Sequence, residues 1–154
     1  MKVVVVLAVS FLLSLLAIKW LQNRYNWQLA GAIAMGIMLL FTSLGHFMFA
    51  KGMSMMLPPF IPFKTALVYL TGIIEIAAAI GLFIPSTRPV TGWLLIIFFI
   101  LILPANIYGA IKHIDFEKAA LNGNGPSYLW FRIPLQVLFI LWTYLCTIYQ
   151  IIQR

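Results

Sequence analysis

Five long stretches of the sequence are apolar and almost free of charge, and this feature leaves few folds open to the chain. They run from about 3 to 18, 29 to 50, 65 to 84, 90 to 111 and 133 to 152. A helix needs about 20 mostly apolar residues to cross the roughly 30 Å of hydrocarbon in a bilayer. The sequence therefore predicts an all-α fold, a multi-pass transmembrane helix bundle.

Composition argues against the main alternatives. The chain is 64% hydrophobic and 8% charged, whereas a soluble domain carries about a quarter charged residues. Its ten Lys or Arg residues are spread over the ends of the stretches, which is typical of membrane anchoring and excludes a nucleic-acid partner. The sequence lacks the extended alternation of a transmembrane β-barrel. Cys146 is the only cysteine, so a C-x-x-C pair or a thiolate metal site is excluded.

The first stretch has two interpretations. It has the lysine and apolar core of a signal peptide, but Ala17-Ile18-Lys19 is not an A-x-A cleavage site, and the apolar run is long. We interpret it as a retained helix. The predicted organisation is then residues 1–28 as an N-terminal transmembrane helix with its connector, and residues 29–154 as a four-helix membrane domain.

Two connections are longer than turns. Residues 51–64 are apolar but contain three prolines, which forbid a continuous helix. They predict an apolar loop at the membrane interface or, alternatively, an adaptable surface for an apolar ligand; its residues are Met53, Met55, Met56, Pro58 and Pro59. In residues 112–132 we expect a short helix from Asp115 to Leu121, followed by a turn at 122–126.

Small residues recur four positions apart in the second and third stretches. They are Ala32 with Gly36 and Ala77 with Gly81. Such pairs let helix backbones approach closely in a membrane. The spacing predicts that these two helices pack against each other through these residues.

Glu75 is the one charged residue deep inside a stretch, about 15 Å from either end at 1.5 Å per residue. An acidic group at mid-span costs roughly 3 kcal/mol on insertion scales. We therefore expect Glu75 to have polar partners. At comparable or shallower depth, the same half of the bilayer holds His46, Asn106, Arg132 and Gln136. Thr42 lies one turn from His46 on the same helix face.

We hypothesise that His46, Glu75, Asn106, Arg132 and Gln136 line one intramembrane polar pocket that opens toward the long loops. The alternative is a helix-to-helix hydrogen-bond network without a ligand, because such bonds commonly serve packing. In the last stretch, polar residues at helical spacing predict a stripe that faces the bundle interior: Arg132, Gln136, Thr143, Thr147 and Gln150. Pro104 is expected to free a backbone carbonyl, that of Ile100, near the cluster.

The sequence has too few suitable residues for a metal site, a haem site or a catalytic triad. A zinc site wants three or four good ligands, and only His46 and Glu75 lie at suitable depth. The two histidines lie at different depths, which disfavours a haem pair. No serine has a histidine and a carboxylate beside it for a catalytic triad. We therefore name no catalytic residue and no metal ligand, and expect no enzyme activity from the chain on its own.

Six short motifs resemble, in order, the DoxX-like family of small bacterial membrane proteins. They are Gly45-His46-Phe47, Met55-Met56-Leu57-Pro58-Pro59, Tyr69-Leu70-Thr71-Gly72-Ile73-Ile74-Glu75, Pro85-Ser86-Thr87-Arg88, Pro104-Ala105-Asn106-Ile107 and Trp130-Phe131-Arg132-Ile133-Pro134-Leu135-Gln136. The resemblance covers about Leu29 to the end. It implies a four-helix DoxX-like core, to which the first helix is an addition.

The resemblance also implies a place in the bacterial cytoplasmic membrane, with both ends of the core on the cytoplasmic side. The family takes its name from a subunit of a thiosulfate:quinone oxidoreductase. This favours a small membrane subunit of a quinone-linked redox system, with other membrane or redox subunits as partners. Two alternatives stay open: a non-catalytic lipid- or partner-binding assembly or stress factor, and a small proton-coupled transporter. A homodimer is compatible with each.

Overall fold

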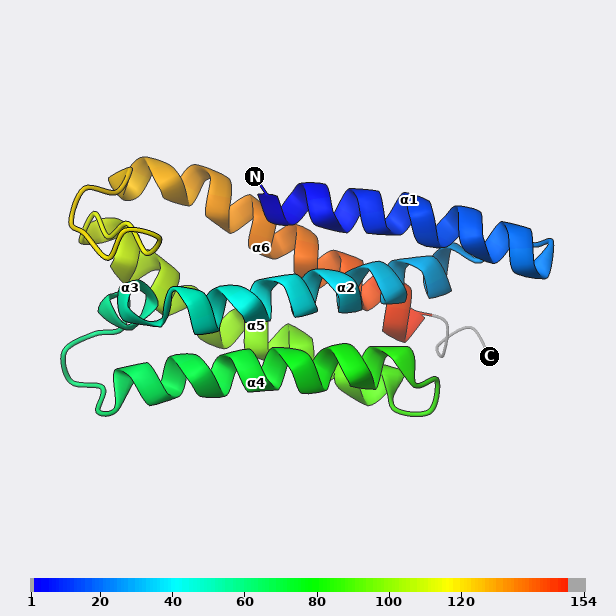
Figure 1. The fold of residues 1–154 in the computed structure, drawn as a ribbon, viewed down its shortest axis with the longest axis horizontal. Coiled ribbons are helices and arrows are strands. Elements are labelled where there is room, and N and C mark those ends of the chain that lie inside the picture. Colours follow the sequence, from blue (N-terminus) through cyan, green and yellow to red (C-terminus); the bar gives the residue numbers. More distant parts are fainter. Residues whose placement is uncertain (1, 150–154) are drawn as a thin grey trace.

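The computed structural model describes residues 2–149 and consists of helices joined by short loops (Figure 1). The long helices are α1 (Lys2–Gln22), α2 (Trp27–Met48), α4 (Lys64–Phe83), α5 (Arg88–Ile111) and α6 (Leu129–Thr143). The short ones are α3 (Ala50–Met55), the 3-10 turn η1 (Gly125–Tyr128) and the π-helical turn η2 (Tyr144–Ile148).

Five helical segments of the described chain are long and apolar enough to span a membrane, the last being Gly125–Ile148 with η1, α6 and η2 in one run. The prediction of an all-helical fold with five helices able to cross a membrane by length and composition is thus confirmed for residues 2–149. Charged residues stand where several of these helices begin or end, such as Lys64 and Arg88.

Several predicted span boundaries are wrong. The first helix continues to Gln22, beyond its predicted end at about 18. The second helix stops at Met48 instead of Ala50, because the chain bends at Phe49 and Ala50 begins the separate helix α3. The last helix begins well before residue 133, since η1 and α6 continue without a break from Gly125. Arg132 therefore lies within a helix rather than ahead of it. The predicted end at 152, with Gln150 and Arg154, falls outside the described residues.

The expected helix from Asp115 to Leu121 is also wrong. Asp115 Oδ1 accepts hydrogen bonds from the backbone N–H groups of Glu117 and Lys118, and Asp115 forms an isolated antiparallel bridge with Ala120. These two bonds are those of a helix N-cap, but the backbone does not go on as a helix. The N–H and C=O groups of Asp115 pair with those of Ala120, and Ala119 has a φ of 51°, in the left-handed region. The segment is a compact turn.

The bundle has α2 at its centre. In Figure 1, α2 runs between α1 on one side and α4 on the other, with α5 behind them, and α2 packs against both flanking helices. The end that carries α3 and residues 112–124 is called here the α3 end. The opposite end, with the connection from α1 to α2, is called the α1–α2 end. Both terms are used below because membrane depth decides what each polar residue can reach.

Helix α1 contributes to the core of the bundle. Its buried residues, Leu7, Ser10, Ser14 and Ile18, recur at helical spacing and so form one stripe. Leu7 is 2% exposed and joins the main apolar cluster, which includes Met35 and Leu39 of α2 and Phe139 of α6. The ring of Phe11 meets Trp142 of α6 edge to face at 5.0 Å. The added helix is therefore packed into the bundle along this face.

Small residues do bring α2 and α4 together, but not all of those predicted. A Cβ added at Gly36 would lie 2.7 Å from the ring of Phe83 and 3.5 Å from the carbonyl of Ala79. Gly81 instead faces Thr91 of α5. Ala77 lines an apolar hollow of about 210 Å³ between α4 and α5. The prediction is wrong for Ala77 and Gly81 because the face of α4 toward α2 carries Gly72, Glu75, Ala79 and Leu82.

Candidate functional site

Glu75 is buried on the face of α4 that meets α2. It stands eleven residues after Lys64, about 16 Å along the helix axis. The buried positions of α4 are Val68, Gly72, Glu75, Ala79 and Leu82. Their spacing of three and four residues is that of one helix face. A carboxyl group is therefore placed between two helices deep within the bundle, where it cannot rely on water.

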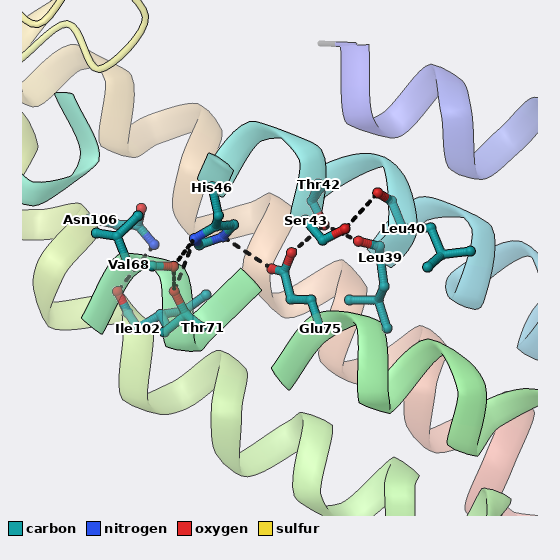
Figure 2. A network of polar contacts seen from close by, with 10 residues as sticks. All are labelled: Leu39, Leu40, Thr42, Ser43, His46, Val68, Thr71, Glu75, Ile102 and Asn106. Atoms are coloured by element: carbon teal, nitrogen blue, oxygen red, sulfur yellow. Dashed lines mark hydrogen bonds and ion pairs between the residues drawn. The ribbon is translucent and has the colours of Figure 1, made fainter. Parts of the chain in front are cut away.

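Two side chains of α2 meet this carboxyl group (Figure 2). Thr42 Oγ1 donates a hydrogen bond to Glu75 Oε2 at 2.8 Å, and His46 Nε2 lies 3.4 Å from Glu75 Oε1. Thr42 and His46 are four residues apart and so share one face of α2. Both oxygens of Glu75 thus have a polar partner.

The other ring nitrogen of His46 faces back to α4. His46 Nδ1 lies 2.9 Å from Thr71 Oγ1 and 3.2 Å from the backbone carbonyl of Val68. The Thr71 hydroxyl also donates to that carbonyl at 2.8 Å. Four side chains from two helices therefore form one network: Thr42, His46, Thr71 and Glu75. In Figure 2 it runs from Glu75 toward Val68, that is, toward the α3 end.

Gly72 makes room for this network. A Cβ at Gly72 would lie 2.9 Å from His46 Cβ and 3.3 Å from the ring of Phe47. The α4 backbone therefore passes as close to α2 at this level as a residue without a side chain permits. This close approach lets Glu75 and Thr71, one turn apart on α4, reach the same imidazole.

Two predicted members of the pocket have other partners. Asn106 Nδ2 donates to the carbonyl of Ile102 in its own helix at 3.2 Å. Gln136 Nε2 donates to the carbonyl of Phe99, which ties α6 to α5. This carbonyl lies one residue before that of Ile100, the acceptor expected from Pro104. The structure thus brings His46 and Glu75 into direct contact, and bonds Asn106 and Gln136 elsewhere.

Arg132 lies in the first turns of α6, at the α3 end. Its side chain is partly buried, and within residues 2–149 its Nε has no hydrogen-bond partner although that atom is buried. A buried, unpaired N–H of a cation is unusual. It marks Arg132 as a donor still open to an acceptor.

The predicted apolar loop, which includes most of α3, packs against α5 and residues 112–124. Its five residues fall in and after α3, where Met53, Met55, Met56 and Pro58 are partly buried and Pro59 is exposed. Met56 lies against Gly109 of α5, and Gly52 lies against the backbone of Phe116. Phe60 and Phe63, further along the loop, are almost fully exposed. The segment covers the α3 end of the bundle, and its two exposed phenylalanines project from it.

Thr71 is the site residue that sequence reasoning missed. Its position four residues before Glu75 was an available signal, because this spacing puts both on one side of α4. The predicted polar stripe of the last helix does face inward: Gln136, Thr143 and Thr147 are buried. For a metal, His46 and Glu75 supply two ligand-type groups, and no third His, Cys, Asp or Glu joins them within the described part of the chain.

The comparison with family models places the chain in a family. The model of a domain of unknown function, DUF8561, matches residues 35–147. The chain belongs to the DUF8561 family. The matched region begins within α2 and ends in η2, so it contains the whole network as well as Asn106, Arg132 and Gln136, while α1 lies outside it. No curated protein and no solved structure matches the chain.

Proposed function

We propose that this protein is a small membrane subunit of a quinone-linked redox system in the bacterial cytoplasmic membrane. In this proposal α2, α4, α5 and α6 form a DoxX-like four-helix core. Support comes from polar residues of the site that lie within the motifs that carry this resemblance. His46 and Glu75 belong to two of them, and Asn106 and Arg132 to two others.

The observation that carries the proposal is the pair formed by His46 and Glu75, with 3.4 Å between Nε2 and Oε1. An ionisable group held within a membrane is costly and is by default a sign of function. Imidazole and carboxyl groups within bonding reach are suited to passing a proton. We therefore assign the pair the task of exchanging a proton with a membrane-soluble reactant.

The described residues include a hydrogen-bond donor that suits a quinone. A quinone carries electrons and takes up protons at its carbonyl oxygens when it is reduced. The unpaired N–H of Arg132 Nε could donate a hydrogen bond to such an oxygen, and the His46–Glu75 pair would supply or receive the proton. The electrons would come from a partner subunit. The chain alone is accordingly not proposed to be an enzyme.

A second function is favoured by a different observation. Asn106 and Gln136 are bonded to backbone carbonyls inside the bundle, as expected of side chains that serve helix packing. This supports a non-catalytic bundle that binds a lipid or a partner protein. A proton-coupled transporter would use His46 and Glu75 as relay groups. Quinone binding separates the redox function from the other two, and acidification or alkalinisation of liposomes that contain the protein alone would identify a transporter.

The test measures quinone binding directly. The protein is transferred into lipid nanodiscs, a short-chain quinone is titrated, and quenching of tryptophan fluorescence is recorded. We expect saturable binding that weakens at least tenfold in Arg132→Met and in His46→Leu. The control is Thr147→Val, which keeps its shape and lies at the α1–α2 end. Equal binding by all four proteins, or none by the parent, would refute the quinone proposal. Native mass spectrometry of the gently extracted protein then shows whether a lipid or a protein is retained instead.

A further inference from the structure

Each threonine hydroxyl of the network has two alternative hydrogen-bond acceptors. Thr42 Oγ1 is 2.8 Å from Glu75 Oε2 and 3.1 Å from the carbonyl of Leu39. Thr71 Oγ1 is 2.9 Å from His46 Nδ1 and 2.8 Å from the carbonyl of Val68. A hydroxyl has one proton to donate and can also accept. Rotation of either hydroxyl can therefore adapt the network to a different position of the proton.

This geometry accommodates both protonation states of the pair. With Glu75 ionised, Thr42 donates to Oε2, His46 Nε2–H donates to Oε1, and Thr71 donates to Nδ1. When a proton binds at Nδ1, the proton on Nε2 can pass to Oε1. The imidazole is then neutral again as the other tautomer, and Glu75 is a neutral carboxyl group. Thr71 now donates to Val68 and accepts from Nδ1–H. One proton has been taken up, and the network retains a full set of partners.

The path for this proton leads toward the α3 end. Side-chain exposure rises from 6% at Glu75 to 18% at His46, and Thr71 is partly buried. The network reaches the carbonyl of Val68, about one turn from Lys64, where α4 begins. Figure 2 shows Val68 and Asn106 on one side of His46 and Glu75 on the other.

Toward the α1–α2 end the same seam is closed by apolar side chains. The buried residues of α2 and α4 beyond Glu75 include Leu39, Met35, Ala79 and Leu82, each with no exposed surface. They belong to the main apolar cluster, together with Leu95, Phe98 and Phe99 of α5. Along the seam between α2 and α4 these close-packed side chains leave no room for a water chain. The apolar hollow of about 210 Å³ lies on the other side of α4, against α5, and an apolar cavity stays dry.

Tyr69 of α4, whose ring stacks on Phe47 at 5.8 Å, lies near the level of His46. The other titratable groups around the pair stand at other levels of the bundle. The charged residues of the helices packed on α2 and α4 lie near helix ends: Lys2 and Lys19 in α1, Lys51 in α3, Arg88 in α5 and Arg132 in α6. Tyr108 lies in the last turn of α5, and Tyr144 and Cys146 lie in η2 at the α1–α2 end. Among the described residues, His46 is thus the titratable group in contact with Glu75.

We infer that the His46–Glu75 pair exchanges protons with only one side of the membrane, the side that carries α3 and residues 112–124. This inference rests on the proposed function in that the pair handles a proton. It adds the side of the membrane on which the proton is exchanged. A quinone that exchanged a proton with this pair would take it up from that side, or release it to that side, alone. A transporter, which needs access from both sides in turn, would require the apolar seal to open.

Single cysteines provide the first test. In a Cys146→Ala background, Thr71→Cys and Ala79→Cys are placed in sealed vesicles and treated with a charged, membrane-impermeant thiol reagent from either side. Asn124→Cys and Asn23→Cys, in the loops of the two ends, report the sidedness of each preparation. We expect Thr71→Cys to react only from the side of Asn124, and Ala79→Cys from neither. Reaction of either from the side of Asn23, or no reaction of Thr71→Cys, would overturn the inference. Should Thr71→Cys not fold, Glu75→Cys carries the same expectation.

Infrared difference spectroscopy provides the second test. The pH is stepped on one side of vesicles with uniformly oriented protein, and the carbonyl band of protonated carboxyl groups is followed. We expect a change that is absent in Glu75→Gln, and only for steps on the side of residues 112–124. A response to the opposite side would contradict the inference. These results are independent of quinone: one-sided titration without quinone binding would refute the proposed function and leave the inference standing.

Discussion

At the α3 end of the bundle, α2 and α4 are joined by hydrogen bonds among His46, Glu75, Thr42 and Thr71. At the α1–α2 end, α2 and α5 meet the last helix through glycines. A Cβ at Gly31 would overlap Cys146 Sγ, and one at Gly92 would overlap Thr147 Oγ1. In lipid, helices gain little from apolar contact as such, so they associate through polar bonds or close packing. The α3 end combines the polar network with a close approach at Gly72. The α1–α2 end relies on glycine contacts, with one hydrogen bond from Trp142 Nε1 to the carbonyl of Gly31.

The two kinds of contact differ in how much they can change while the helices stay packed. The polar network contains hydroxyls with alternative partners and can change its protonation without changing shape. The glycine contacts have no such freedom, since the atoms opposite them are buried side chains of η2. The π turn itself brings three successive residues, Cys146, Thr147 and Ile148, into the interior. The comparison predicts a rigid end and an adaptable end.

The largest effect is expected for Gly31→Ala. The new methyl group would occupy the position of Cys146 Sγ, and overpacking of this kind costs about 1–3 kcal/mol. Thermal unfolding in detergent should show a lower Tm than the parent. The double variant Gly31→Ala with Cys146→Ala should recover most of the loss. If the single variant melted with the parent, the α1–α2 end would not be rigid.

Gly72→Ala tests close approach at the adaptable end. Its Cβ would meet His46 Cβ at 2.9 Å, so the helices must move slightly apart, at a cost partly offset by the better helix propensity of alanine, about 1 kcal/mol. We expect a modest net loss of stability and weaker quinone binding. The matched control is Gly45→Ala, whose Cβ would find ordinary contacts at 3.7 and 4.0 Å. Indistinguishable behaviour of the two variants would mean that Gly72 does not position His46.

Thr42→Val should have a smaller effect. It keeps the shape of the side chain but removes the hydrogen bond to Glu75, and such interhelical bonds average about 0.6 kcal/mol in a membrane protein. Thr147→Val is the counterpart at the other end, where the hydroxyl donates within its own helix to the carbonyl of Thr143. Unfolding measured in the same detergent should rank Thr42→Val as the less stable. The reverse order would contradict an interhelical role for Thr42.

The smallest effect is expected outside both contacts. Lys2 Nζ lies 3.3 Å from Glu117 Oε1, with side chains 77% and 47% exposed. Substitutions at such surface positions change stability by about 0.5 kcal/mol or less. Lys2→Ala should therefore unfold close to the parent, at low and at high salt. A larger loss would show that the junction of α1 with residues 112–124 stabilises the bundle as much as either end does.

The long helices could be predicted because in a membrane the pattern of charge and apolar length largely decides where a span begins and ends. The predicted start of α4 is within one residue of Lys64, for example. The loops were harder. Asp115 makes the side-chain bonds of a helix N-cap, yet the chain turns back at Ala119, whose φ is 51°, and no local residue signals this turn.

For the candidate site, depth along the helices brought His46 and Glu75 together, and the structure places them in contact, but depth did not predict the partners of the other residues. His46 and Glu75 lie at compatible depths on helices that pack together. Asn106 and Gln136 also lie in that half of the bundle, but each donates a hydrogen bond to a backbone carbonyl instead. Depth cannot reveal the rotation of a helix about its axis or the position of a free carbonyl. Those depend on packing elsewhere along the same helices, such as the contact of Gly92 in α5 with Thr147.

The burial of Leu7 has a consequence for the outer wall of the bundle. With α1 in place, Leu7 packs into the cluster that contains Met35 and Phe139. A bundle without α1 would present these core side chains to lipid tails, which can cover them with little penalty. The family-matched part of the chain would then have a lateral face open to membrane-soluble molecules. Helix α1 thus covers this lateral face of the core.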